Sequence, residues 1–360
     1  MNPIRRRHRF GGPWGPLRRS NSHRAGTGPW RGLLRLLMAA LVIGVLVLGI
    51  PLYFAGMGQA PQVPAPPAPA GGDLTLRLYR DDLDVLVELP LEAYVEGVTA
   101  AEMPAAFHPE ALKAQAVVAR TYAVRRLPFF GGRGCDRHPE ADLCSDPATG
   151  QAYMDEAQMR DRWGPVRYWL YRRRIRQAVR ETQGEILVFD GGPIDAVYHS
   201  TSGGHTENAA AVWGRHVPYL VGVPSPHEED SPRFLQEFTF TVAEVAARLD
   251  IPAGVIRRAL AAGEEVITVV ETGVSGRPVT LSIAGTTMAA TEFRQRLDLP
   301  STWFTHRWHD GRLTLEVRGY GHGVGMSQYG AQGMAQAGYD YRAILAHYYR
   351  GARLRPMFME

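Results

Sequence analysis

Lysine is almost absent from this chain of 360 residues: 40 positions are Lys or Arg, and Lys113 is the one lysine. Such a bias usually follows from genome composition, so it draws attention to Lys113 without giving it a role. Cysteine is nearly as scarce, with two residues, which is too few for the disulfide framework of a small secreted domain. The sequence also has no internal repeats, which excludes a repeat architecture.

Acidic residues are missing from the first 57 positions, where there are nine arginines. The formal net charge of +4 therefore combines a strongly basic N-terminal segment with a mildly acidic remainder. That remainder gives no reason to expect a nucleic-acid partner. With 45% hydrophobic and 21% charged residues, the composition is globular and excludes a wholly disordered or collagen-like chain.

One long hydrophobic run follows the arginines. Residues 36–57 contain no charge and are LLMAALVIGVLVLGIPLYFAGM. As a helix they would span about 33 Å, close to the thickness of a bilayer core. Because the arginines precede the run, we predict a cytoplasmic tail (1–35), a retained transmembrane helix and an exported body. A cleaved signal peptide is the alternative, but the run is long for one and begins far from the N-terminus.

The exported part starts with a spacer. Residues 58–72 are GQAPQVPAPPAPAGG, and proline at this density favours an extended, semi-rigid linker of about 45 Å. Residues 73–360 are then predicted to form one α+β domain, with antiparallel strands and interspersed helices around a substrate cleft. The pattern predicts helices over 91–98, 109–126, 166–182, 242–249, 291–297 and 342–349. It predicts strands over 73–89 (a hairpin), 185–189, 194–198, 238–240, 266–271 with 279–284 (a hairpin), and 313–318. A long ordered loop is expected over 129–161.

A carboxylate and two cations stand close together in the first of three notable blocks, PLEAYVEGVTAAEMPAAFHPEALKAQAVVARTYAV. Pro104 disfavours helix for the residue before it, so Glu102 should lie at a helix end. Lys113 and Arg120 are seven positions apart and therefore share a face of the next helix. Nearby cations would lower the pKa of Glu102 and an apolar wall would raise it. A surface salt-bridge cluster is the alternative for this block taken alone.

Two further blocks combine polar side chains with glycine. The second is AVYHSTSGGHTENAAAVWG, beginning at residue 196, and the third is GYGHGVGMSQYGAQG, beginning at residue 319. Glycines around His322 let the backbone approach a ligand closely. No Lys-Ser/Thr pair follows them, so a phosphate-binding loop is not expected. Taken alone, His322 would equally suit a packed structural role.

Together and in this order, the three blocks resemble the stage II sporulation protein D family of peptidoglycan-degrading proteins. PYLVGVPSP, SGRPVTLSIAG and ILAHYYRG, further along the chain, extend the resemblance over about 74–354. It implies lytic transglycosylase activity on peptidoglycan glycan strands from which amidases have removed the peptides, during engulfment in sporulation. The family's catalytic acid maps to Glu102. The substrate-binding positions map to Lys113, Arg120, Tyr198, His199, Ser200, Ser202, His322, Ser327 and Gln328, with Gly321 and Gly323 shaping the same region.

A single carboxyl group is enough for this chemistry. Glycoside cleavage needs a protonated carboxylic acid that donates to the leaving oxygen. Glu102 would then, as the carboxylate, deprotonate the muramic acid 6-hydroxyl and close a 1,6-anhydro ring. Donation at neutral pH requires a raised pKa. We therefore predict that Lys113 and Arg120 hold substrate oxygens or orient the site and form no tight ion pair with Glu102.

The cysteine loop departs from the family pattern. Some members carry a structural zinc here, with His, Cys and Cys ligands before a Gln-x-Tyr. In this chain His138 and Cys144 match, Gly150 replaces the second cysteine, and Cys135 is additional. Cys135, His138 and Cys144 would still suit one zinc, while a Cys135–Cys144 disulfide suits an exported protein. A free pair of cysteines is the third alternative. All three stay open, and catalysis requires no cofactor in any of them.

The resemblance also implies partners: a membrane-anchored amidase/endopeptidase and a polytopic membrane protein of the engulfment machinery, at the sporulation septum. A second functional hypothesis is a non-catalytic peptidoglycan-binding enhancer of a partner amidase, in which Glu102 would only bind. A plain scaffold protein would leave the Tyr, His, Ser and Gly blocks unexplained.

Overall fold

The computed structural model describes Met38 and residues 74–358, a mixed α+β structure. The chain divides into two compact units, of which the second covers Gly71–Glu360. The predicted transmembrane run 36–57 lies outside the described residues apart from Met38. Among the residues that are described, no helix has the length and apolar character needed to cross a membrane.

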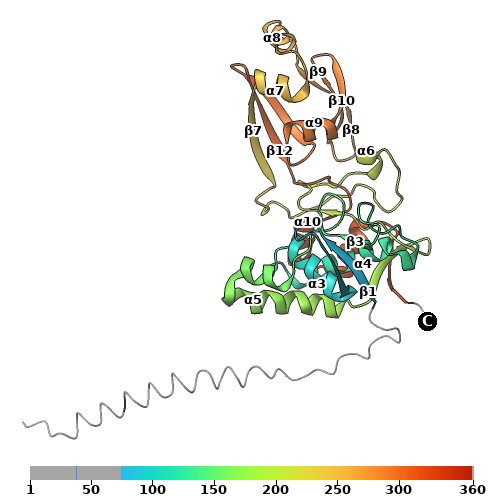
Figure 1. Cartoon of the computed structure of the whole chain (residues 1–360). Coiled ribbons are helices and arrows are strands. Elements are labelled where there is room, and N and C mark those ends of the chain that lie inside the picture. Colours follow the sequence, from blue (N-terminus) through green and yellow to red (C-terminus); the bar gives the residue numbers. More distant parts are fainter. Residues whose placement is uncertain (1–37, 39–73, 359–360) are drawn as a thin grey trace, which may run out of the picture. The chain divides into compact units, whose positions relative to one another are not determined.

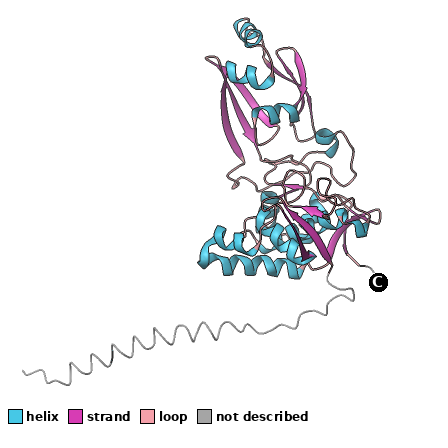
Figure 2. Cartoon of the chain, in the orientation of Figure 1, coloured by secondary structure: helices cyan, strands magenta, loops and turns pink. Residues whose placement is uncertain are grey.

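Helices and strands are interspersed along the described chain (Figures 1 and 2). The helices are α3 (Leu91–Glu102), α4 (Pro109–Arg126), η2 (Pro128–Phe130), α5 (Glu156–Glu181), α6 (Ala209–Trp213), α7 (Val242–Leu249), α8 (Ala253–Ala261), α9 (Ala290–Leu297), α10 (Gln328–Gln336) and α11 (Tyr341–Tyr348). The strands are β1 (Thr75–Arg80), β2 (Val85–Pro90), β3 (Leu143–Cys144), β4 (Glu185–Phe189), β5 (Gly192–Pro193), β6 (Tyr198–His199), β7 (Leu235–Thr241), β8 (Ile267–Thr272), β9 (Pro278–Ile283), β10 (Thr286–Ala289), β11 (Trp303–His309), β12 (Arg312–Arg318), β13 (Met326–Ser327) and β14 (Arg353–Pro356).

The strands form small sheets in the orders β2-β1-β3, β10-β9-β8, β11-β12-β7, β13-β6 and β14-β4-β5. Most neighbours are antiparallel, and both predicted hairpins are confirmed, as β1–β2 and β8–β9. The exceptions are β1 with β3 and β13 with β6, which pair in parallel over two residues each. The β13–β6 pair matters for function because it joins the second and third sequence blocks.

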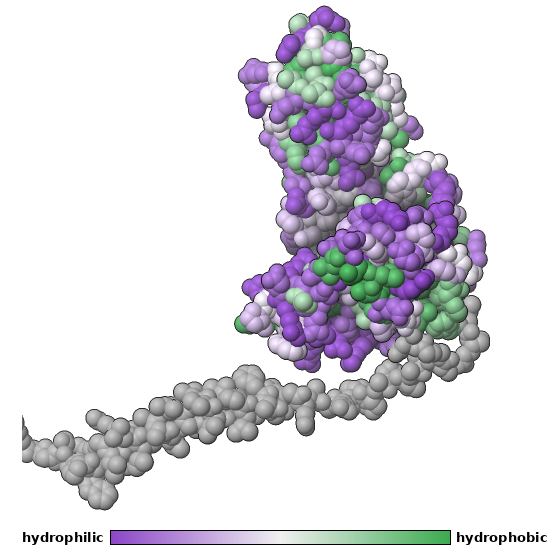
Figure 3. Space-filling model, in the orientation of Figure 1, coloured by the Kyte–Doolittle hydropathy of each residue, from purple (hydrophilic) through white to green (hydrophobic). Residues whose placement is uncertain are grey.

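Helix α4 lies at the centre of the fold because nearly all of its faces are buried. Alanines on opposite sides of the helix are fully buried. One side packs with α10, α11 and β4, and the other packs with β1, α3 and α5. A third cluster, between the β7–β12–β11 sheet and α7–α9, is built from other residues. Most of the drawn surface is hydrophilic (Figure 3), as expected when the apolar residues fill these clusters.

Local signals explain the elements that agree with the sequence. Helix α4 begins at Pro109, as predicted, because proline suits the first turn. Helix α7 begins after Thr241, whose hydroxyl and Glu244 form a capping box. The expected strand over 194–198 is wrong: β5 is Gly192–Pro193 and only Tyr198 of that stretch enters β6.

The long loop predicted over 129–161 is also partly wrong. It contains the short strand β3, and α5 already begins at Glu156, after a capping box formed by Asp155 and Gln158. Helix α5 is broken at Gly164, whose φ of 67° is outside the helical region, just before Pro165. The prediction from residue 166 therefore found only the second half of this helix.

Candidate active site

Glu102 is the last residue of α3, at the helix end predicted for it. The next residue, Met103, has extended backbone angles (φ −120°, ψ 138°), and its N–H still donates to the carbonyl of Thr99, at 3.1 Å. Pro104 follows and excludes further helix. The turn therefore leaves the Glu102 side chain half-buried rather than on the open face of a helix.

Burial is the main influence on the charge of Glu102, and it raises the pKa of the carboxyl group above its ordinary value. Two hydrogen bonds oppose this. The Ala152 N–H donates to Glu102 Oε1 at 2.8 Å, and Tyr198 also hydrogen-bonds to the carboxylate. No lysine, arginine or second carboxyl group of the described chain contributes to the shift. Glu102 can therefore hold a proton at a higher pH than an exposed glutamate.

A chain of hydrogen bonds fixes Tyr198 against Glu102. Gln151 Nε2 donates to the Tyr198 hydroxyl at 3.0 Å, and the Tyr94 hydroxyl donates to Gln151 Oε1 at 3.2 Å. Gln151 is 1% exposed, and burial raises the pKa of Tyr198 well above its ordinary value. Tyr198 therefore stays a neutral hydroxyl beside the acid, with its position set by α3 and by the segment before α5.

The third block reaches Glu102 through Gln328. Gln328 Nε2 donates to the Glu102 backbone carbonyl at 3.0 Å and lies 3.3 Å from Gln115 Oε1. The Ser327 hydroxyl donates to the Ser200 carbonyl at 3.3 Å and caps α10 by accepting from the Gly330 N–H. The three blocks that suggested the family are thus joined in one place, although 226 positions separate Glu102 from Gln328.

His199 and His322 are placed as packed residues. His322 Nε2 donates to the Tyr198 carbonyl at 2.9 Å while its Nδ1 accepts from the Val324 N–H, which is the pattern of a neutral ring. Burial lowers the pKa of His322 to about 4. His199 Nδ1 donates to the Val324 carbonyl, and burial lowers its pKa well below the ordinary value. Both rings are therefore neutral at pH 7 and hold β6 against the glycine block.

The two serines of the second block differ. Ser200 is half-buried, with its hydroxyl 3.3 Å from that of Thr201. Ser202 is fully buried and donates to Glu228 Oε1 at 2.8 Å. The predicted substrate contact of Ser202 does not fit this position, because its hydroxyl is enclosed and already has a partner.

Arg120 also differs from its expected role. It is fully buried and paired with Glu92, with Nε to Oε1 at 2.8 Å and Nη2 to Oε2 at 2.6 Å. Its Nη1 donates to the Glu185 carbonyl at 3.1 Å. The expected contact with substrate oxygens therefore does not fit the position of this guanidinium, which instead ties α4 to α3 and β4.

Lys113 is paired as well. Its Nζ is 2.7 Å from Glu110 Oε1 and 2.6 Å from Glu181 Oε2. Both cations therefore have carboxylate partners other than Glu102 in this structure. The Lys113 side chain is 16% exposed. Burial lowers its pKa, but its partners Glu110 and Glu181 raise the pKa by more, so Lys113 stays charged.

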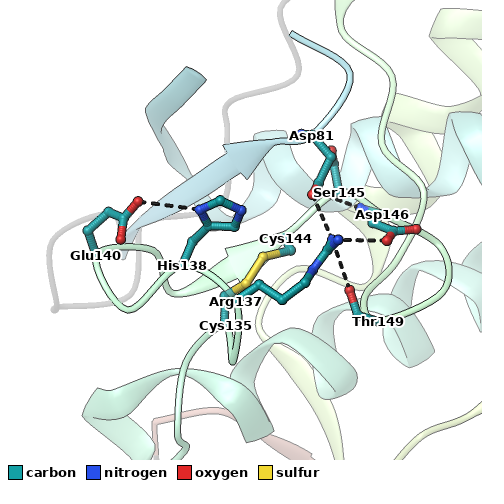
Figure 4. Close-up of a disulfide and its surroundings, with 9 residues drawn as sticks. All are labelled: Asp81, Cys135, Arg137, His138, Glu140, Cys144, Ser145, Asp146 and Thr149. Atoms are coloured by element: carbon teal, nitrogen blue, oxygen red, sulfur yellow. Dashed lines mark hydrogen bonds and ion pairs between the residues drawn. A yellow bond between two sulfur atoms is a disulfide. The ribbon is translucent and has the colours of Figure 1, made fainter. Parts of the chain in front are cut away.

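The two cysteines form a disulfide, which is one of the alternatives left open by the sequence (Figure 4). His138 does not join them: its ring stacks on Tyr79 at 3.4 Å between centroids, and its Nδ1 is 3.5 Å from Glu140. Within the described residues, no group of three or more His, Cys, Asp or Glu side chains is placed to hold a metal ion. The zinc ligand set Cys135–His138–Cys144 does not fit this arrangement.

Gly150 stands where the family pattern has its second cysteine. A Cβ at this position would lie 2.2 Å from the Cys144 carbonyl oxygen. The loop is held from outside by Arg137, whose Nη2 is 2.7 Å from Asp81 and 2.9 Å from Asp146 (Figure 4). The disulfide and this ion-pair cluster together fix the segment that delivers the Ala152 N–H to Glu102.

Sequence reasoning missed a buried charged network behind the second and third blocks. Glu228 accepts from Ser202 and from the Gly203 N–H at 2.8 Å, and Glu207 accepts from Ser275. Arg277, 2% exposed, donates to the carbonyls of Ser202 and His205. These residues lie in or beside the quoted segments, but spacing alone does not reveal that they are buried.

Known proteins provide the last observation. A family model described as "Stage II sporulation protein" matches residues 79–189. Stage II sporulation protein D of Bacillus amyloliquefaciens is 38% identical over 279 residues, covering 77% of this chain and 78% of the relative. The protein of the same name from Bacillus subtilis is 37% identical, covering 78% and 79%. A Bacillus subtilis protein called "Amidase enhancer" is 28% identical over 72% of this chain and 40% of its own length.

Proposed function

The chain belongs to the stage II sporulation protein D family, and on that premise we propose that it is a lytic transglycosylase of sporulation. Its substrate would be peptide-free glycan strands of peptidoglycan, cleaved to 1,6-anhydro-muramic acid ends. The observation that carries the proposal is Glu102: a half-buried carboxyl group with a raised pKa, to which no cation of the described residues is paired. These are the properties required of a general acid at neutral pH.

In the first step, the protonated Glu102 gives its proton to the glycosidic oxygen as the bond from the muramic acid anomeric carbon to that oxygen breaks. The departing sugar leaves with a hydroxyl, and positive charge develops at the anomeric carbon. In the second step, the Glu102 carboxylate removes the proton from the 6-hydroxyl of the same muramic acid. The 6-oxygen bonds to the anomeric carbon, and Glu102 is protonated again.

The other groups of the site position the acid. The Ala152 N–H fixes one carboxyl oxygen, and Tyr198 hydrogen-bonds to the same carboxyl group. Both bonds favour the carboxylate, so they support the second step, while burial favours the protonated form needed for the first. A hydrolase of the usual type would add a second carboxyl group to activate water. No such group influences Glu102 within the described residues.

We place the protein, as part of the same proposal, at the cell membrane with its N-terminus in the cytoplasm and its body at the sporulation septum. Its partners there would be a membrane-anchored amidase/endopeptidase, which supplies peptide-free strands, and a polytopic membrane protein of the engulfment machinery. This rests on the predicted transmembrane run and on family membership.

The decisive variant is Glu102→Gln, which keeps the size of the side chain and removes its proton chemistry. Peptide-free glycan strands are incubated with each protein, and the products are identified by mass spectrometry. We expect the loss of anhydro ends to be at least about 100-fold, as is typical when a general acid is removed. Glu96→Gln is the matched control, since Glu96 is on the same helix and burial also raises its pKa. Near-normal release by Glu102→Gln would disprove the mechanism.

A second candidate function has its own support. Similarity to the protein called "Amidase enhancer" favours a binding role in which the chain stimulates a partner amidase without cleaving glycan. That hypothesis predicts no anhydro product from the wild-type protein, and full stimulation of the amidase by Glu102→Gln. The same two proteins therefore separate the hypotheses.

A further inference from the structure

The outward face of the second half of α5 combines exposed apolar and cationic side chains. This helix runs along an edge of the part of the structure that also contains α3, α4 and β1 (Figure 1). Its inner face packs into their hydrophobic cluster through Tyr168, Ile175 and Val179. We call the opposite face, made of Val166, Trp169, Leu170, Arg173, Gln177 and Arg180, the outer stripe. These positions follow the three- and four-residue spacing of one helix side.

The N-terminal end of the outer stripe is strongly apolar. Val166 is 87% exposed, Trp169 66% and Leu170 56%. Single exposed hydrophobic residues are ordinary, but three neighbours with a tryptophan form a patch. The break at Gly164 and Pro165 starts a new helical segment directly before this patch, so the patch occupies the first turns of that segment.

The surroundings of the patch are positively charged. Residues 165–181 contain six arginines and one glutamate. Three of the arginines are used within the protein: Arg172 pairs with Glu156, Arg176 pairs with Glu96, and Arg174 donates to the carbonyls of residues 105 and 107. The exposed side chains of Arg167, Arg173 and Arg180 form no ion pair or hydrogen bond with the part of the chain that the structure describes.

We propose that the outer stripe docks on an anionic lipid surface, with Val166, Trp169 and Leu170 entering the interface and the free arginines contacting lipid phosphates. A helix with tryptophan and leucine on one side and arginines beside them has the composition of an interfacial membrane helix. Three side chains cover far less than the roughly 800 Å² per partner of a stable protein interface, so a second protein suits the patch less well. Charge complementarity selects an anionic bilayer in particular.

The sequence before the described body also suits docking on a membrane. The uncharged run 36–57 is followed by a spacer of 15 residues and then by the described body. A body tethered at this length stays within reach of its own bilayer, which raises its effective concentration at the surface. Weak docking is therefore enough to hold the body down, and its release would let the site reach glycan further from the membrane. The inference is independent of the reaction proposed for Glu102.

The test uses residues 71–360, which form one compact unit with the hydrophobic clusters inside it. Co-flotation is measured with vesicles of phosphatidylcholine alone and of about 7:3 phosphatidylcholine to phosphatidylglycerol. We expect binding to the anionic vesicles, weakened by salt, and little binding to phosphatidylcholine. Two variants are compared with the wild type. One carries Trp169→Ser and Leu170→Ser in the outer stripe, and the other carries Arg173→Gln and Arg180→Gln in the stripe together with Arg167→Gln beside it. The arginine variant should weaken binding by about 100-fold, since each of the three arginines contributes roughly fivefold at such a surface.

Matched controls remove the same kinds of side chain elsewhere. Val270→Ser with Val274→Ser changes two residues that are 60% and 59% exposed. Arg215→Gln with Arg257→Gln and Arg312→Gln removes three exposed charges. Binding should survive in both, and urea unfolding should show that all the proteins are folded. The proposal is overturned if the wild-type segment does not float with anionic vesicles, or if the controls lose binding as much as the outer-stripe variants.

Discussion

Replacing Arg120 with methionine tests whether this arginine belongs to the fold or to the substrate. The guanidinium is fully buried and donates two hydrogen bonds to the Glu92 carboxylate, while the Glu92 side chain is 28% exposed. Removing one partner of a buried pair costs about 3–5 kcal/mol, because the other charge is left without compensation. Since Glu92 can still reach water, we expect about 3 kcal/mol, at the lower end of that range.

The loss is measured by urea unfolding of residues 71–360, followed by circular dichroism. With an m-value of about 3 kcal/mol/M for a protein of this size, the midpoint should fall by about 1 M. Arg125→Met is the matched control on the same helix. Its side chain makes one exposed bond, to the Pro193 carbonyl, so its cost should stay below about 1 kcal/mol. Arg120→Met combined with Glu92→Met should be less costly than Arg120→Met alone, because no unpaired charge remains.

The opposite pattern would refute this reasoning. If Arg120→Met unfolds at nearly the wild-type urea concentration but no longer binds peptide-free glycan strands, the guanidinium must contact substrate in a conformation that differs from this structure. The role implied by family resemblance would then be right, and the pairing with Glu92 would be secondary.

Two shorter predictions concern the acid and the loop beside it. Because burial raises the pKa of Glu102, activity should fall as the pH rises through that raised pKa. Tyr198→Phe removes a hydrogen bond that lowers the pKa of Glu102, so the pH–rate profile of this variant should shift to higher pH. An unshifted profile would contradict the assignment of Glu102 as the acid. The Cys135–Cys144 bond closes a short loop. Reducing this bond in the native protein should therefore cost about 2–3 kcal/mol in urea unfolding, and zinc added to the reduced protein should not restore the loss. Full recovery with zinc would favour the metal site instead.

Glycine misled sequence reasoning about α10. The stretch 319–338 is crowded with glycine and no helix was predicted there, yet α10 occupies Gln328–Gln336. Two of its glycines make room for neighbours: a Cβ on Gly330 would meet the Tyr348 hydroxyl, and one on Gly333 would meet the His227 carbonyl. Glycine in a helix usually signals instability. Here the cost is offset by close packing, which depends on residues far away in the sequence.

The candidate site was predictable in part. Proline after Met103 placed Glu102 at a helix end, and the family resemblance implied that the three segments line one site. The protonation state of Glu102 was not predictable. Its desolvation depends on the segment around Ala152 and on Tyr198, and the spacing of residues in the sequence does not show that these lie next to the acid. The partner of Arg120 was equally hidden, since Glu92 is 28 positions away on another helix.

The cations of α4 and the proton of Glu102 are parts of one electrostatic arrangement. Helix α4 carries Lys113 and Arg120 and packs against α3, which ends at Glu102. A free cation close to Glu102 would stabilise its carboxylate and lower its pKa. Each is instead paired with carboxylates from outside the site: Lys113 with Glu110 and Glu181, and Arg120 with Glu92. With their charges satisfied, burial remains the main influence on Glu102. Neither cation contributes to the pKa shift of Glu102, so the ion pairs stabilise the central helix while burial governs the proton of the acid.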